Sequence, residues 1–385
     1  MDFAYSARVD DLRARLSGFM DAHILPANHR WTELAEAGSY PLEIVEPLKA
    51  RAKAEGLWNL FLPGLGNDEP GTRLSNLEYA PLAETMGRVP WASEVFNCSA
   101  PDTGNMEVLH LFAALEQRSR WLDPLLAGTI RSVVSITEPD VASSDPTNLQ
   151  TTIRREGETY VIDGRTWFNT GALHPNATFL LVMGISNQAP DAPRHRRHSF
   201  VIVPMDAPGF RIVRNVPIMN HHAPEGHCEV AFESVRVPVA NRLGDEHAGF
   251  AIAQARLGPG RIHHCMRTIG QCELALDLMC ARALERRAFG RALADYANNQ
   301  DEIALSRIEI DQARLLCLAG GLAHGRRRQP GGARRRLGHQ DRGGAAADPR
   351  ARPRHAGVRR HGPLERHPAR LSMDMGPFAT LHRRT

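Results

Sequence analysis

Hydroxyl and aromatic side chains gather in two short runs about thirty residues apart in this 385-residue chain. The first run, Thr137 to Ser144, is a polar loop of Pro, Asp and Ser that follows a strand-like segment. The second, Trp167 to Thr170, ends an alternating, strand-like segment. A hairpin of this kind places hydroxyls, backbone N–H groups and one aromatic platform along the edge of a flat heteroaromatic ring. The pattern suits a flavin.

The two runs together resemble the middle domain of the acyl-CoA dehydrogenase family. The first reads Thr-Glu-Pro and then Ser-Ser-Asp (137–145), and the second reads Asp-Gly-x-x-Trp-Phe-x-Thr-Gly (163–171). Residues 97–107 (NCSAPDTGNME) look like the branch of that family whose animal members carry a fused kinase-like domain, which we do not expect in this chain. The resemblance covers about 320 residues and implies FAD as cofactor and an acyl-CoA as substrate.

By residue match, the resemblance assigns some positions to the cofactor and others to the substrate. Thr137 and Thr170 would bond the flavin ring, which Trp167 and Phe168 would flank. Phe168 and Asn169 depart from the family's commoner Trp-Ile pattern, which bears on ring stacking. The expected cofactor contacts are Ser135, Ile136, Thr137, Ser143, Trp167, Phe168, Asn169, Thr170, Arg286 and Phe289. The expected substrate contacts are Ser144, for the CoA arm, with Gly258, Pro259, Gly260 and Arg261.

Two further motifs are candidates for binding an anionic group. We interpret residues 257–261 (LGPGR) as a tight kink that feeds a helix, whose free N–H groups could meet an anionic or carbonyl group beside Arg261. Residues 285–290 (ERRAFG) resemble the family motif in which an arginine reaches the FAD pyrophosphate of a neighbouring subunit. That arginine is Arg286, with Phe289 packing nearby, and its fork clamps phosphate as a lysine cannot. Cofactor binding would then require a homodimer or homotetramer.

Hydrophobic periodicity divides the chain into regions. Apolar residues follow helical spacing before residue 130, alternate with period two up to residue 242, and return to helical spacing up to residue 321. We therefore expect a multidomain α and β protein, and the resemblance implies that its fold is acyl-CoA dehydrogenase-like. Its parts are an N-terminal α-helical domain (1–130), a middle β-barrel-like domain (131–242), the first half of a C-terminal helical bundle (243–321) and a tail (322–385).

The tail has a different composition from the rest. It holds 16 arginines and four acidic residues, so the formal charge of +4 conceals an acidic remainder. Aromatic interleaving and recognisable modules are absent, which argues against specific nucleic-acid binding. Codons can be chosen for Val358 to Pro368 that, read from the second base, give Phe-Gly-Ala-Met-Gly-Leu-Ser-Ser-Asp-Thr-Pro, similar to the glycine-rich segment with which the family closes over FAD. We interpret the tail as the family's remaining helices translated out of frame.

The catalytic residue is unknown from the sequence. In the family, a carboxylate on a C-terminal loop removes the α-proton of the acyl-CoA while hydride leaves for flavin N5. A frameshift removes that loop. Some members carry the base on the helix near Gly260, which cannot serve, and Asp374 in the tail has no claim beyond chance. The chain is therefore expected to be inactive as written.

Residue types and their spacing also bear on metal binding, cellular location and partners. The six cysteines show no metal-ligand spacing, and His221, His222, Glu225 and His227 fit a loop near the flavin better than a metal site. Neither a secretory signal nor a run of eighteen apolar residues is present, so we expect a cytoplasmic protein without a membrane span. An electron-transfer flavoprotein is the electron acceptor implied by the family. The alternatives are an oxygen-using acyl-CoA oxidase-like relative, a non-catalytic CoA or flavin binder, and a basic-tail interaction protein.

Overall fold

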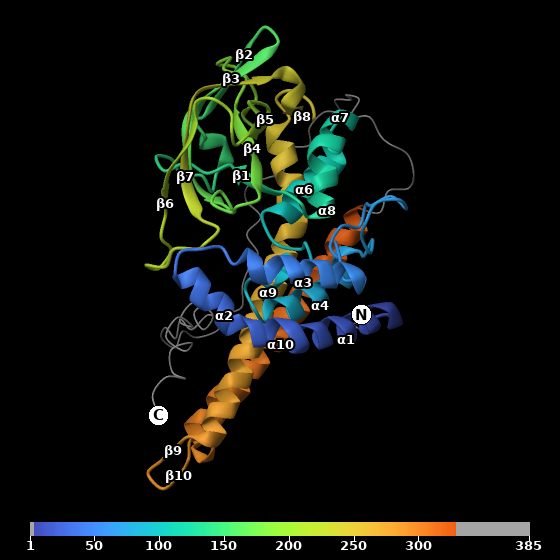
Figure 1. The fold of residues 1–385 in the computed structure, drawn as a ribbon, viewed down its shortest axis with the longest axis vertical. Coiled ribbons are helices and arrows are strands. Elements are labelled where there is room, and N and C mark those ends of the chain that lie inside the picture. Colours follow the sequence, from blue (N-terminus) through green and yellow to red (C-terminus); the bar gives the residue numbers. More distant parts are fainter. Residues whose placement is uncertain (1–3, 329–385) are drawn as a thin grey trace, which may run out of the picture.

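A helical region comes first along the chain (Figure 1). The structure, a computed structural model, describes residues 4–328, with side chains as far as Gly320. Local signals begin two of the helices: Ser6 and Ser75 accept backbone N–H groups as N-caps, and Glu78 completes a capping box with Ser75. The helices are α1 (Ala7–Phe19), α2 (Leu25–Glu36), α3 (Leu42–Ala54), α4 (Asn76–Gly87), α5 (Ala92–Val95), α6 (Asp102–Phe112), α7 (Leu115–Gln117) and α8 (Asp123–Ala127), with π-helical turns at Met20–Ile24 and Arg118–Leu122.

A sheet follows, with strand order β6-β7-β3-β2-β4-β5-β8 and β1 paired to β4. The β1–β4 pair and the short β2–β4 contact are parallel, and the other pairs are antiparallel. The strands are β1 (Arg131–Ser135), β2 (Thr152–Glu156), β3 (Thr159–Thr170), β4 (Ala177–Ile185), β5 (His198–Pro204), β6 (Phe210–Asn215), β7 (His227–Pro238) and β8 (Arg242–Leu243).

The sheet has two buried faces because its central strands are apolar on both sides. On β4, Phe179 and Leu181 pack against the helices, while Leu180 and Val182 belong to a separate core within the sheet. Successive side chains of a strand point to opposite faces, so one apolar run serves both cores. The helix–sheet–helix order confirms the expected fold class.

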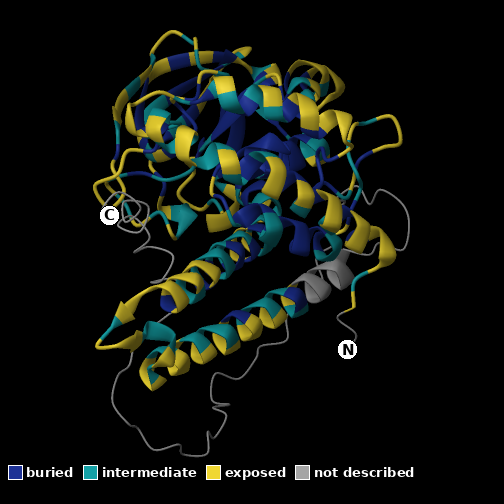
Figure 2. Cartoon of the chain, turned by 60° about the horizontal axis from the view of Figure 1, so that its bottom comes forward, coloured by how far each residue is buried: buried dark blue, intermediate teal, exposed yellow. Residues whose placement is uncertain are grey.

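A long helical hairpin completes the described chain. Helix α9 (Gly249–Glu285) runs for 37 residues, and α10 (Ala297–Arg328) returns beside it after the short strands β9 (Arg287–Ala288) and β10 (Arg291–Ala292). Its far end projects from the body and is largely exposed (Figures 1 and 2). Helix α10 continues past residue 321, where we expected the packed chain to end.

The kink expected at residues 257–261 is wrong. Helix α9 passes through this segment without a break, and Pro259 lies buried inside it. Proline removes one backbone hydrogen bond and disfavours a helix interior, but packing of α9 on α4 and α6 outweighs that local preference. No helix N-terminus is therefore available at Gly260.

No helix of residues 4–328 is both long enough and apolar enough to cross a membrane. Within the same range, no three His, Cys, Asp or Glu side chains are placed to hold a metal ion.

Candidate active site

The two motif runs meet at the end of β3. The Thr137 hydroxyl donates to the carbonyl of Trp167 at 2.6 Å, and the Trp167 N–H donates to the carbonyl of Thr137 at 3.0 Å. This reciprocal pair fixes the polar loop against β3, so residues thirty apart in sequence meet at the C-terminal end of this strand. Trp167 and Phe168 contact each other with ring centroids 4.7 Å apart.

Glu138, the central residue of the Thr-Glu-Pro motif, holds the loop from inside. It is 4% exposed and accepts hydrogen bonds from the backbone N–H groups of Gln150 (2.8 Å) and Thr151 (2.7 Å) and from the Thr151 hydroxyl (2.6 Å). Ser143 closes the turn by accepting from the Glu138 N–H at 2.8 Å. Three hydrogen bonds to one buried carboxylate satisfy it without a counter-ion.

Thr170 is paired with a histidine. Its hydroxyl lies 2.9 Å from Nδ1 of His227 on the neighbouring strand β7. Burial lowers the pKa of His227, an effect that Glu225 only partly opposes, so the ring is neutral at pH 7. A hydroxyl that donates to such a nitrogen keeps oxygen lone pairs for a ligand N–H, and the same holds for Thr137.

The structure does not bring the side chain of every expected cofactor residue to this end of β3. Ser135 and Asn169 are fully buried, and their side chains bond within the sheet, to Thr166 (2.6 Å) and to the carbonyl of Cys228 (3.0 Å). Ile136 is half-buried beside Thr137. Phe168, by contrast, is 41% exposed and has a positive φ of 52°. A large exposed aromatic in that strained conformation is consistent with a surface that a ligand covers.

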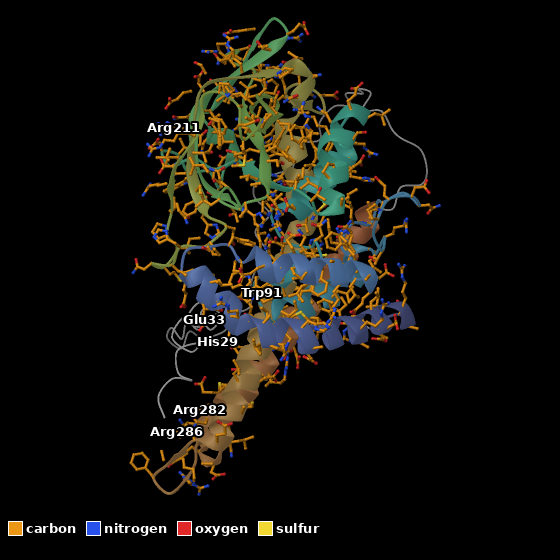
Figure 3. All side chains as sticks on the ribbon, viewed as in Figure 1. His29, Glu33, Trp91, Arg211, Arg282 and Arg286 are labelled. Atoms are coloured by element: carbon orange, nitrogen blue, oxygen red, sulfur yellow. The ribbon has the colours of Figure 1, made fainter. Side chains whose placement is uncertain are left out.

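Arg286 and Phe289 lie elsewhere. Both belong to the far end of the α9–α10 hairpin, where Phe289 is 99% exposed and Arg286 ends α9 (Figure 3). They lie too far from the expected flavin site of their own chain to contact it. This position agrees with the expectation that they would reach the cofactor of a neighbouring subunit. Of the substrate residues, Ser144 is exposed on the polar loop, and residues 258–261 lie along α9.

A recess of about 220 Å³ joins Thr170 to α9. Thr170 and Gly171 form part of one wall, and His264 and Arg267 of α9 form part of another. Among the remaining lining residues are Tyr40, Trp91, Glu94, Ser99, Arg131 and Glu225. The recess thus lies between the expected flavin edge and the helix that carries the expected substrate residues.

A buried ionic network forms one side of this recess. Arg131 pairs with Glu94 (Nη1–Oε2, 2.7 Å) and with Asp102, and His174 lies 3.0 Å from the Glu94 carboxylate. Burial alone would raise the pKa of Glu94, but Arg131, together with hydrogen bonds from His174 and Tyr40, lowers it to about 2. Glu94 is therefore ionised and poorly basic at neutral pH.

The run 97–107 acts as a junction between domains. Asp102 accepts the backbone N–H of Ser132 on β1 at 2.8 Å, and Asn105 donates to the Ser132 hydroxyl at 2.8 Å. The side-chain oxygen of Asn105 accepts a hydrogen bond from the guanidinium of Arg256 on α9 at 2.8 Å. Burial lowers the pKa of Arg256 to about 10 against the opposing effect of Asp102 and Glu107. The partners of this run cannot be read from the sequence, because only the fold brings β1 and α9 to it.

Comparison with known proteins defines the class and then the family. Models of the acyl-CoA dehydrogenase N-terminal, middle and C-terminal domains match residues 6–129, 134–235 and 247–333. The protein named Probable acyl-CoA dehydrogenase FadE2 of Mycobacterium tuberculosis is 53% identical over 323 residues, covering 82% of this chain and 77% of its own. The chain belongs to the acyl-CoA dehydrogenase family.

Other relatives differ in length. Acyl-CoA dehydrogenase family member 11 of Mus musculus is 46% identical over 327 residues, but the chain spans only 41% of that protein. A solved structure of an acyl-CoA dehydrogenase from Mycobacterium abscessus is 47% identical, with a TM-score of 0.78 over 83% of this chain and 80% of that one. A glutaryl-coenzyme A dehydrogenase complex, at 22% identity and a TM-score of 0.71, shares the fold.

Proposed function

We propose that this chain derives from an FAD-dependent acyl-CoA dehydrogenase that introduces a double bond between the α and β carbons of an acyl-CoA. The observation that carries the proposal is the pairing of Thr137 with Trp167 near Thr170, at the C-terminal end of β3 and next to the recess. Two hydroxyls with spare lone pairs and an exposed aromatic fit the polar edge and flat face of a flavin. When bound, FAD supplies the acceptor for the hydride from the β carbon.

The chain's own residues have separate tasks in this proposal. Thr137 and Thr170 hold the ring edge, with Trp167 and Phe168 flanking it. Ser144 and residues 258–261 position the CoA arm and the thioester. We propose no cofactor contact through the side chains of Ser135 and Asn169, because both are buried and hydrogen-bonded within the sheet.

We assign the general base to none of the described residues. Of the two carboxylates that line the recess, Glu94 is held by Arg131 with a pKa of about 2, so Glu225 is the one alternative in the recess to a base on the C-terminal loop. We propose that the base belongs to a C-terminal loop lost by a frameshift. Asp374 and residues 329–385 of the basic tail lie outside the described part of the chain. Sequencing the gene across residues 315–385 tests the frameshift directly.

We further propose a homodimer or homotetramer in which Arg286 and Phe289 of one chain meet the cofactor of another. The exposed position of both residues at the hairpin end supports this. An electron-transfer flavoprotein is the proposed acceptor, and the cytoplasm the proposed location. The 46% identity to the animal protein family member 11 supports the proposed branch of the family, although the match covers only 41% of that protein.

The activity test compares the 385-residue chain with a frame-corrected chain. Each is mixed anaerobically with short to very long acyl-CoAs while flavin absorbance is followed. We expect yellow, FAD-containing protein and rapid bleaching from the frame-corrected chain only, because loss of a positioned base costs about 100-fold to 10,000-fold in rate. A folded, frame-corrected protein without flavin would contradict the proposed function. Comparable bleaching by the 385-residue chain would show that a base remains, and Glu225→Gln and Asp374→Asn would then locate it.

A further inference from the structure

Two cysteines on different helices lie opposite each other where α9 and α10 pack together. Cys265 of α9 is exposed and Cys317 of α10 is half-buried, and both are free thiols. Neither has a role in the proposed function, although His264, the neighbour of Cys265, lines the recess. The other cysteines of the chain are buried or half-buried. Cys265 is therefore the one exposed thiol among the described residues.

The ion pairs between the two helices fix the register that makes these cysteines neighbours. Glu273 of α9 pairs with Arg307 at 2.7 Å and also with Arg314, so it faces the middle of the α10 segment between them. Because α10 runs back alongside α9 (Figure 1), two turns towards the start of α9 correspond to two turns towards the end of α10. Two turns are about seven residues, which leads to Cys265 on one helix and Cys317 on the other.

Both cysteines also lie on the faces along which the helices pack. On α9, Cys265 is followed at helical spacing by Ile269 and Cys272, which are buried. On α10, Cys317 follows the buried Ile310 by two turns. Ile269, Cys272 and Ile310 belong to one core, and Cys317 packs against it. The two thiols are therefore at the border of a shared contact surface.

The two thiols interact directly. The pKa of Cys317 is raised to about 11, chiefly by burial and next by the adjacent Cys265 thiol, with a smaller contribution from Glu84 of α4. Such an interaction requires the two sulfur atoms to be close, as the helix register also indicates. Cys317 is protonated at neutral pH, whereas Cys265 faces solvent and is the thiol that a reagent in solution meets first.

We propose that Cys265 and Cys317 are a redox-sensitive pair, which a small-molecule disulfide such as oxidised glutathione converts to a disulfide that ties α10 to α9. The Cys265 thiolate attacks one sulfur of the small disulfide, which forms a mixed disulfide and releases one small thiolate. Cys317 then attacks the Cys265 sulfur, and the second small thiolate leaves. The two protein thiols are oxidised, the small disulfide is reduced to two thiols, and the two protons pass from the protein to these thiols.

The disulfide would strengthen a part of the hairpin that has little buried contact. Among the described side chains of α10, only Ile310 and Leu318 are buried. The bond would close a loop from residue 265 to residue 317, and a disulfide across a long loop restricts the unfolded chain. It would also hold the turn of α9 that carries His264, so one wall of the recess would be fixed against α10.

The test follows the free thiols of the purified 385-residue chain in mixtures of oxidised and reduced glutathione. After alkylation of the remaining thiols and digestion, mass spectrometry identifies the linked peptides. We expect one pair of peptides joined through Cys265 and Cys317, and a loss of two free thiols from the six of the reduced chain. The urea midpoint should rise on oxidation and return to its starting value with dithiothreitol.

Serine variants assign the link. Cys265→Ser and Cys317→Ser should each abolish the linked peptides and the rise in the urea midpoint. The matched control is Cys280→Ser, because Cys280 is a half-buried cysteine of α9 outside the pair. It should form the same link as the wild-type chain, with the same loss of two thiols. Urea midpoints of the reduced variants, compared with the reduced wild type, show whether a serine has altered the fold.

The wild-type chain alone can overturn the inference. Retention of all six thiols in oxidised glutathione, a glutathione adduct that stays on Cys265, or a link through another pair of cysteines would each do so. A Cys265–Cys265 link between two chains, which a non-reducing gel shows at twice the chain mass, would also contradict it. A Cys265–Cys317 link that leaves the urea midpoint unchanged would overturn the stabilising effect. No readout uses FAD or an acyl-CoA, so the proposed function is tested separately.

Discussion

The carboxylate of Glu94 is surrounded by three groups that all favour its charged form. Arg131 lies at 2.7 Å, His174 at 3.0 Å, and the Tyr40 hydroxyl donates to the same carboxylate. Although burial alone would raise the pKa of Glu94, these partners lower it from 4.5 to about 2. A group with a depressed pKa in the folded state stabilises the fold above its unfolded pKa and stops doing so as pH falls through the folded value. The contribution is therefore complete at neutral pH and is lost between about pH 5 and pH 2.

Glu94→Gln should lower the free energy of unfolding at pH 7 by about 3 kcal/mol, because it leaves Arg131 with one buried carboxylate fewer. It should also flatten the fall in stability between pH 5 and pH 3, where the wild-type protein loses this contribution. Urea midpoints across that pH range measure both effects. Glu116→Gln, at an exposed position on α7, serves as the control. A wild-type pH slope in Glu94→Gln would show that another carboxylate dominates acid unfolding.

Thr170→Val removes the hydroxyl that we assign to the flavin edge and nearly preserves the side-chain volume. In the frame-corrected chain it should weaken FAD binding by about 1 kcal/mol, the typical net contribution of one hydrogen bond, or shift the flavin potential accordingly. Fluorescence titration with FAD and a redox titration provide the readouts. Thr159→Val, at the opposite end of β3 with its hydroxyl in a turn, should leave both unchanged. Identical titrations for Thr170→Val and wild type would remove Thr170 from the site.

The sequence could predict the pairing of the two runs but not which side chains face outward. Simple alternation along β3 breaks where the register with β7 shifts between Thr166 and Asn169. Phe168 takes up the irregularity with its positive φ, and Asn169 turns into the sheet. A bulge adds one residue to one strand and so reverses the faces beyond it. Nothing in the local composition of Trp167 to Thr170 indicates it.

Helices α4 and α9 pack unusually closely at two glycines. A Cβ atom at Gly270 would lie 2.0 Å from the carbonyl oxygen of Glu84, and one at Gly87 would lie 2.2 Å from that of Arg267. Both obstacles are backbone atoms of a packed helix, so the helices would have to separate. The glycines are therefore needed for the approach of the helices, since Gly is otherwise unfavourable in a helix interior.

Gly270→Ala should destabilise the fold by roughly 1–3 kcal/mol, the usual range for overpacking, despite a helix propensity better by about 1 kcal/mol. Gly260→Ala is the matched control on the same helix, because a Cβ there meets no atom within 4 Å. That variant should be neutral or slightly stabilising. Urea unfolding of the two variants side by side is decisive: equal midpoints would mean that α4 moves aside at little cost.

Helical periodicity predicted that residues 247–321 form helices, but it could not predict where α9 begins. The Gly-Pro-Gly at 258–260 is a strong local signal for a break. Pro259 is nevertheless buried in a continuous helix, because contacts from α4 and α6, distant in sequence, favour one straight element. The loop-to-helix assignment failed for lack of that tertiary information.

At the scale of the whole molecule, the α9–α10 hairpin leaves apolar side chains uncovered. Leu284 and Leu316 are 70% and 76% exposed, and Leu278, Leu305, Ile308 and Leu315 are each about half exposed. Exposed apolar side chains of this kind favour association. The acyl-CoA dehydrogenase class was predictable from the motifs, but the extent of this surface was not, because it depends on which helices follow.

We therefore expect the 385-residue chain to self-associate without a defined stoichiometry. Replacing Leu284 and Leu316 with Ser should shift light-scattering masses toward the monomer. Leu115→Ser is the control, since Leu115 is 81% exposed on α7, outside the hairpin. The frame-corrected chain should give a discrete dimer or tetramer. A monodisperse 385-residue protein whose mass is unchanged by the double replacement would show that these side chains do not drive self-association.

Helix α9 is also a lever. Its 37 residues span about 55 Å, and roughly 30 Å of that length separates His264 at the recess from Arg286, so a small tilt at the body becomes a displacement of ångströms at the tip. A guanidinium at the end of such an arm can hold a phosphate only if the far end is clamped by a second molecule. In the proposed oligomer, where Arg286 of one chain meets the FAD of another, retention of the cofactor would follow the mass action of assembly. Dilution of that protein should then release FAD even when the free FAD concentration is held constant.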